Sequence, residues 1–342
     1  MPVEQGDARS GPDPEDARPA EERAVPTSAR FVRSAEFGLV GATFVAIIGF
    51  GLAEPSFLTA ENAQSILRAV AAVGLIAVGQ GFLLITHEFD LSVGAVAGFG
   101  AVLAGQLMIS DGVPWPLAGA IGVLAGATAG LVNGLLVAKA KIPALVVTLG
   151  MLYVARGLSS VTTGGYQLSG LPAEFRSVGV ANILGLPWGT WIFLAAVVGG
   201  EVVLRFTTFG RRLYATGGNP RAAEYTGLRP ERVKIIAFVL VGSLSAMAGI
   251  LTVARIGMAD PTVGGGWELQ SIGGAVVGGI SLFGGVGTVL GAFLGVVFLQ
   301  VITTGLIIGG FDTSLKDVAV GVLLITAIAV DRWRQRRFAS GA

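Results

Sequence analysis

The sequence predicts an all-α, polytopic membrane protein, and the prediction follows from its composition and the placement of its charges. Hydrophobic residues make up 53% of the 342 residues and charged residues only 13%, against about 25% in an average soluble chain. Of the 45 charged residues, 12 fall in residues 1–33, ten in 201–234 and five in 331–342. Long apolar stretches with so few charges exclude a soluble domain and a nucleic-acid-binding face, which needs clustered Lys and Arg.

The first segment is polar. Residues 1–33 contain five prolines among alternating acidic residues and arginines, and they have no apolar core that would suit a cleavable signal peptide. Such a composition does not bury enough apolar surface to fold. We therefore expect residues 1–35 to form a disordered N-terminal tail.

Ten apolar segments follow, each close to the roughly 20 residues that a transmembrane helix needs. They lie at 36–53, 64–86, 91–110, 115–138, 142–162, 188–206, 233–254, 268–284, 287–308 and 316–331. The segment 268–284 is short and broken by glycines, so a re-entrant segment is the alternative there. Residues 36–333 are thus the predicted membrane domain, and 334–342 are a basic C-terminal tail.

The basic residues predict the orientation of these spans. Alternate connections and the C-terminal tail hold most of them: Lys139, Lys141, Arg205, Arg211, Arg212, Arg221, Arg229, Arg232, Lys234, Arg332, Arg334, Arg336 and Arg337. The opposite connections hold only Arg176 and Arg255. Because cytoplasmic loops are enriched in Lys and Arg, both termini and the loop 207–232 are expected on the cytoplasmic side.

Glycines recur every fourth residue at Gly122, Gly126, Gly130 and Gly134. This spacing places them on one smooth helical ridge, where a neighbouring backbone can approach closely. The spacing is common in membrane helices, so generic helix packing is the simplest interpretation.

The cytoplasmic loop contains the signals of a short helix. Asn219 is a helix N-cap residue, Pro220 suits the first helical position, and Gly227 suits the residue after the last turn. Gly217 and Gly218 allow a sharp turn before it. A helix of about two turns is too short to be stable alone. The pattern predicts a docking helix for a cytoplasmic protein, with an ordinary surface loop as the alternative.

Several stretches of the sequence resemble a known family. They are DLSVG at 90–94, GLVNGLLVAKAKIPALVVTLGM at 130–151, RGL at 156–158, TFGRRLYATGGNPRAAEYTGL at 208–228, and WELQSIGGAVVGGISLFGGVGTVLGAFLG at 267–295. Together they are similar to the permease subunit of ATP-binding-cassette (ABC) sugar importers of the ribose, xylose and arabinose type. The resemblance extends over about residues 36–333.

The resemblance implies partners and a mechanism. The expected partners are a second permease chain, either a copy or a paralogue, cytoplasmic ATPase subunits that carry ATP and Mg, and an extracytoplasmic sugar-binding protein. It places the protein in a prokaryotic cell membrane as a multi-pass protein. It also implies that the segment 220–227 docks into the ATPase. The implied coupling residues are Gly210, Arg211, Gly217, Gly218, Asn219, Pro220, Ala222, Ala223, Glu224 and Gly227.

One stretch departs from the family. Where the family usually has glycines before DLSVG, this chain has Thr86-His87-Glu88-Phe89. A pH-sensitive element at His87 is one interpretation, and a solvated loop histidine is the other.

The residue counts exclude several kinds of catalysis. There is no cysteine and only one histidine, so thiol chemistry is absent and a zinc site or a Ser-His-Asp triad has too few members. A P-loop needs Lys followed by Ser or Thr, but the four lysines precede Ala140, Ile142, Ile235 and Asp317. We expect no cofactor or metal in this chain, no enzymatic activity of its own, and ATP hydrolysis on a separate subunit.

Polar residues within or beside the apolar spans are the candidates for the substrate path, since neutral sugars need hydrogen-bonding partners. They are Gln80, Asp90, Ser92, Asn133, Thr148, Gln270, Ser271, Gln300 and Thr303. Buried polar groups also join helices to one another, which is the structural alternative. Asp90 suits a cap for the third span, and Glu268 is expected on the external side, where it would meet the binding protein.

The leading hypothesis is therefore the permease of a monosaccharide importer. The scarcity of charge inside the spans favours a neutral sugar, although the sequence does not name which one. One alternative is an ABC permease for branched-chain amino acids or nucleosides, of which the charged amino acids would need complementary groups in the path. Another class is an ion-coupled secondary transporter, which usually needs ionisable residues in mid-span.

Overall fold

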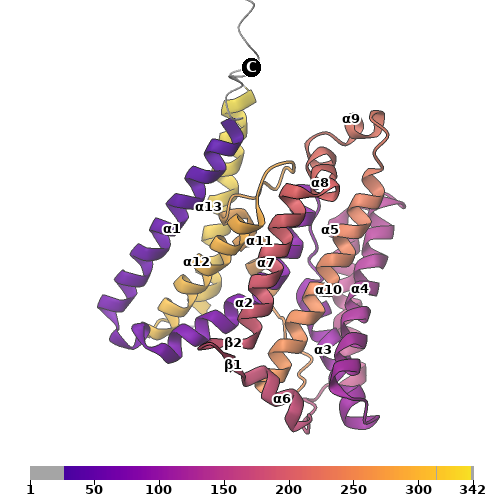
Figure 1. Ribbon diagram of the computed structural model, residues 1–342, viewed down its shortest axis with the longest axis vertical. Coiled ribbons are helices and arrows are strands. Elements are labelled where there is room, and N and C mark those ends of the chain that lie inside the picture. Colours follow the sequence, from indigo (N-terminus) through magenta and orange to yellow (C-terminus); the bar gives the residue numbers. More distant parts are fainter. Residues whose placement is uncertain (1–26, 313, 340–342) are drawn as a thin grey trace, which may run out of the picture.

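The computed structural model describes residues 27–312 and 314–339, which form a bundle of long, roughly parallel helices that we call the layer (Figure 1). Within this part, eight helices are long and apolar enough to cross a membrane. They are α1 (Thr27–Ala53), α2 (Ala60–Ile85), α3 (Val93–Ser110), α4 (Trp115–Ala138), α5 (Ala144–Thr163), α7 (Trp188–Phe206), α10 (Pro230–Ile256) and α12 (Val289–Ile308).

Shorter elements connect these helices. They are η3 (Pro55–Leu58), α6 (Ala173–Val180), β1 (Asn182–Ile183), β2 (Leu186–Pro187), α8 (Thr208–Gly218), α9 (Pro220–Tyr225) and α11 (Trp267–Val277), and α13 (Ser314–Ala339) completes the described chain. The two strands form an antiparallel hairpin, whose turn residues Leu184 and Gly185 both have positive φ, as two-residue hairpins require.

The layer has two ends. We call one the α9 end, because α8 and α9 lie there, and the other the α6 end, where α6 and the hairpin lie (Figure 1). The start of α1 and the finish of α13 are both at the α9 end (Figure 1). Helix α1 begins at Thr27, inside the segment expected to be a tail, and residues 1–26 lie outside the described residues.

Helix α2 is the centre of the fold. Every residue from 70 to 85 is buried, which suits a helix that is apolar on all sides. Helix α10 packs beside it, and the glycine ridge of α4 lies against α10. A methyl group at Gly126 would overlap the Gly242 carbonyl oxygen, and one at Gly130 would overlap the Phe238 carbonyl oxygen. The ridge therefore serves close packing inside the chain.

The predicted helical span at 268–284 is wrong. Helix α11 has only 11 residues, about 16 Å, which is roughly half the hydrocarbon thickness. Residues 257–266 complete the crossing as non-helical chain that runs back along α3. Ala259 forms a β-bridge with Leu168 at the α6 end, and farther along the Val263 carbonyl lies beside Gly98 of α3. We call residues 257–277 the broken crossing.

Helix α3 also begins inside the layer. The loop before it returns from the α9 end until the Asp90 backbone is level with Gln80 of α2, five residues before that helix ends. With the broken crossing and α13, residues 27–312 and 314–339 pass through the layer ten times. Helix α13 is less apolar than the eight, because it carries Lys316, Asp317 and Asp331.

Candidate functional site

Helix α8 extends the α9 end beyond α7, in a segment that the sequence predicted to be loop. Thr207 caps it by accepting a hydrogen bond from the Gly210 amide at 3.2 Å. Gly210 packs so closely against the end of α7 that a side chain would overlap the carbonyls of Val203 and Leu204. A Thr N-cap before the buried Leu213 was the available signal.

Gly217 and Gly218 are the last residues of α8, and the chain changes direction at Asn219, the single extended residue between them and α9. Gly217 is needed because a methyl group there would overlap the Ile85 carbonyl oxygen at the end of α2. The Gly285 amide, from the loop 278–288, donates to that same carbonyl at 2.9 Å. Three segments distant in sequence therefore meet at Gly217.

The loop 278–288 is tied to two further elements. The Tyr214 hydroxyl of α8 donates to the Gly287 carbonyl at 2.6 Å, and the Ser281 hydroxyl donates to Asp331 of α13 at 2.8 Å. Burial, together with the negative charge of Glu201, raises the pKa of Tyr214 to about 12, so the phenol keeps its proton. Helix α8 is thus bonded to the loop that ends the broken crossing.

Helix α9 has the predicted caps. The Asn219 side chain accepts from the Ala222 amide at 3.0 Å, Pro220 is the first residue, and Gly227 has φ +80° after the last turn. Only Ala223 is buried, whereas Ala222 and Glu224 are exposed. Two open pockets, of about 850 and 370 Å³ of empty space, lie between α9, the end of α4 and the start of α10.

Four of the path candidates form one buried cluster, which we call the Asp90 cluster: Gln80, Asp90, Ser92 and Asn133. Gln80 bonds the Asp90 backbone, while the Asp90 carboxylate accepts from the Ser92 amide at 2.7 Å and from the Ser92 hydroxyl at 2.5 Å. Asn133 of α4 donates to Asp90 at 3.0 Å. The cluster fixes the start of α3 within the layer, but Asp90 is not its cap: Ser92 is the N-cap residue, without a side-chain cap bond, and Asp90 accepts from Ser92 ahead of the first turn.

The starts of α3 and α11 meet at Gly94 and Gly264, and we call this contact the central junction. A methyl group on either glycine would overlap the carbonyl oxygen of the other, and Gly264 also has φ +87°. Glu268, in the first turn of α11, lies against Gly94, and its Oε2 is buried without a hydrogen-bond partner. Glu268 therefore lies inside the layer. The sequence-based expectation that it is at the external surface is wrong.

The other path candidates are dispersed. Thr148 donates to a carbonyl of its own helix α5, Ser271 does so in α11, and Thr303 does so in α12. Gln300 donates to Thr304 one turn along. Gln270, beside Glu268 in the broken crossing, is half-buried. Of these, only Gln270 and Ser271 lie next to the central junction.

The departure at 86–89 joins the α9 end. His87 has φ +64°, a conformation that favours glycine, and its ring packs edge-on against Phe283 of the loop 278–288. Glu88 pairs with Lys234 of α10 at 2.5 Å. Both residues contact their neighbours, although His87 is exposed to solvent and Glu88 is half-buried. No group of three or more His, Cys, Asp or Glu that could hold a metal occurs among residues 27–312 and 314–339.

The described part of the chain crosses an apolar helical layer ten times, and the helices α3 and α11 begin inside that layer. With a capped surface helix at one end, this arrangement is typical of a multi-pass membrane transport protein. Comparison with known proteins gives the family. Residues 62–328 match the family described as branched-chain amino acid transport system / permease component, and the chain belongs to it. As a permease component of an ABC transporter, it is a transport subunit and not itself an enzyme.

Its curated relatives cover most of the chain. The ribose import permease protein RbsC of Bacillus subtilis is 38% identical over 84% of this chain and 90% of its own. The L-arabinose ABC transporter permease protein AraH of Azospirillum brasilense is 36% identical over 88% of each. The autoinducer 2 import system permease protein LsrC of Escherichia coli is 36% identical over 82% of each. The comparison with solved structures gave no significant match.

Proposed function

We propose that this chain is the membrane permease of an ATP-driven importer for a monosaccharide of the ribose or arabinose kind. The relatives named for ribose and L-arabinose support a sugar over the branched-chain amino acids in the family's description. The eight apolar helices carry few charges, whereas a zwitterionic amino acid needs complementary charged groups along its path.

The observation that carries the proposal is the broken crossing. Non-helical backbone at membrane depth is tolerated only where it is buried in protein or lines water. In this chain Thr262, Gly265 and Leu269 are exposed, although Gly264 beside them is buried. The exposed side of the crossing therefore faces a water-filled path or a second permease chain. Gln270 and Glu268 border that side and are the strongest candidates to hydrogen-bond a sugar.

The α9 end is the cytoplasmic end in this proposal, because it holds most of the basic residues. Helix α9 then docks into a cytoplasmic ATPase subunit that carries ATP and Mg. The α6 end receives a sugar-binding protein. Both termini are cytoplasmic as a consequence.

The contacts suggest how ATP-driven movement reaches the path. A push on α9 moves α8, which is bonded through Tyr214 to the loop 278–288. That loop directly follows the last turn of α11, and the first turn of α11 lies at the central junction. The movement produced when the ATPase subunits close is thereby transmitted along α11 to the contact between Gly94 and Gly264, beside Glu268. Alternating access follows when this contact opens and closes.

The test is uptake of labelled ribose, arabinose and leucine by the native cells, with the ATPase subunit copurified on the tagged chain. Deleting residues 219–227 should abolish uptake and ATPase association while the chain stays inserted. Glu224→Arg should do so with less disturbance, because Glu224 is exposed on α9. Arg332→Glu, an exposed charge reversal on α13, is the matched control. Normal ATPase association by the deletion would refute docking, and uptake of leucine alone would refute the sugar.

A further inference from the structure

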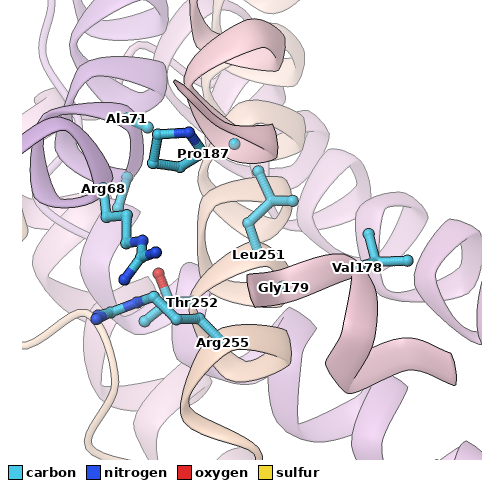
Figure 2. Close-up of a pocket in the computed structure, with 10 residues that line it drawn as sticks. Arg68, Ala71, Val178, Gly179, Pro187, Leu251, Thr252 and Arg255 are labelled. Atoms are coloured by element: carbon cyan, nitrogen blue, oxygen red, sulfur yellow. The ribbon is translucent and has the colours of Figure 1, made fainter. Parts of the chain in front are cut away.

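Two arginines at the α6 end share one pocket, away from the site described above. Arg68 is on α2 and Arg255 is in the last turn of α10, and both line the pocket with Thr252 (Figure 2). Figure 2 shows their guanidinium groups projecting to the same side of the pocket, near the Thr252 hydroxyl. The Thr252 hydroxyl donates to the Ala248 carbonyl, so its oxygen is held in place.

These two positive charges lack a negative partner in the described part of the chain. Neither arginine belongs to any of the ion pairs there, which join Lys141 to Glu231, Arg205 to Glu201 and Lys234 to Glu88. Arg68 donates only to the Gln64 side chain, at 3.3 Å, and its Nε is buried with no partner at all. The positive charge of Arg68 also repels Arg255.

Such an arrangement is unfavourable until an anion joins it. Two guanidinium groups close together repel each other, and a buried N–H without an acceptor is unfavourable because it has lost its hydrogen bond to water. A group with several anionic oxygens satisfies both arginines at once, because a guanidinium fork matches the geometry of phosphate. The chemistry of the pair therefore indicates a phosphate.

The rest of the pocket indicates where that phosphate comes from. Its other walls are apolar or glycine, including Ala71, Leu251, Val178 and Pro187. Trp188 lies between Pro187 and Gly189, both of which line the pocket, and it is partly exposed. Tryptophans gather at the depth of the lipid headgroups. The pocket is thus at headgroup depth, with apolar surface beside the two charges.

We propose that Arg68 and Arg255 bind the phosphate of an anionic phospholipid in the leaflet at the α6 end. The lipid glycerol and the start of its acyl chains lie along the apolar wall. A lipid held here bridges α2 and α10, the two most central helices, with the hairpin before α7. Its binding is independent of which substrate the permease carries.

Native mass spectrometry of the full-length chain tests this, with phosphatidylglycerol added back after delipidation. The wild type should retain one phosphatidylglycerol per chain. The double variant R68Q/R255Q should bind it at least about tenfold more weakly, since each charged hydrogen bond is strong. R68K/R255K keeps both charges but not the forks, so it should fold as the wild type does and still bind several-fold more weakly.

The matched control is Arg176→Gln, which removes an exposed arginine of α6 that does not line the pocket. Equal loss of lipid by this control would overturn the proposal in favour of diffuse surface charge. Equal binding of millimolar inorganic phosphate, with displacement of the lipid, would overturn it in favour of a free anion. If R68Q/R255Q keeps the lipid but loses the sugar-binding protein, the pair is a protein-docking site and the lipid proposal fails.

Discussion

Helix α9 and the central junction differ in how the rest of the chain holds them. In α9 only Ala223 is buried, and the helix depends on one cap at Asn219. At the junction two backbones touch, with no room for a methyl group on Gly94 or Gly264. An exposed, weakly held helix is suited to change partners, whereas the junction is suited to switch between few states. Substitutions in the two regions should therefore fail differently, one in coupling and the other in folding.

The largest effect is expected from Gly264→Ala. A side chain at φ +87° costs about 1–2 kcal/mol, and overlap with the Gly94 carbonyl adds about 1–3 kcal/mol. We expect the free energy of unfolding to fall by about 4 kcal/mol. The detergent-solubilised variant should therefore aggregate in size-exclusion chromatography. Gly170→Ala is the control, because Gly170 has φ +97° but open space around it, and it should cost only about 1–2 kcal/mol. Equal losses would mean that the contact contributes nothing.

Asp90→Ala should be the next most damaging change. It leaves the Ser92 amide, the Ser92 hydroxyl and the Asn133 amide group without their acceptor inside the layer. Unsatisfied buried groups of this kind should lower the free energy of unfolding by about 3 kcal/mol. A thermal-shift assay in detergent measures it, with the exposed Asp111→Ala as control. A melting temperature like that of the wild type would place the cluster outside the structural core.

Asn219→Ala tests the opposite region. Loss of the cap should destabilise α9 by about 1 kcal/mol, without changing global unfolding. Such a change shifts a marginal local equilibrium about fivefold, so sugar uptake should fall several-fold while the melting temperature stays constant. Asn219→Asp keeps a side-chain acceptor and should restore uptake. A fall in melting temperature would contradict the separation of the two regions.

The smallest effect is expected from His87→Gly, at the loop that joins the two regions. Glycine relieves the positive φ of +64° but gains freedom in the unfolded chain and loses the contact with Phe283. The free energy of unfolding of this variant should rise by about 0.5 kcal/mol, which a thermal-shift assay would detect as a higher melting temperature. Leu184→Gly, at φ +53° in the exposed hairpin turn, should give a similar gain. Destabilisation at His87 alone would show that its ring is needed at the loop.

Local signals in the sequence predicted most of the fold, because hydrophobic length and helix caps are local properties. The predicted spans 64–86, 115–138 and 188–206 begin and end within a few residues of the bounds of α2, α4 and α7. The predicted caps at Asn219 and Gly227 were correct. Helix α8 was missed because its glycines suggested a turn, whereas Gly217 serves a contact with Ile85, distant in sequence. Hydropathy also placed Glu268 at a surface, since no local signal reveals that residues 257–266 return along α3.

The broken crossing also has a consequence for how the chain is made. A helix that inserts by its own hydrophobicity can enter the bilayer as soon as it leaves the ribosome. Residues 257–277 offer only an 11-residue helix, and Glu268 at its start adds an ionisable group that disfavours insertion. This segment is retained only against a surface already in place, with α3 providing the backbone contact. Synthesis order then matters: α3 is complete well before the broken crossing emerges, and it acts as the template on which that crossing is assembled.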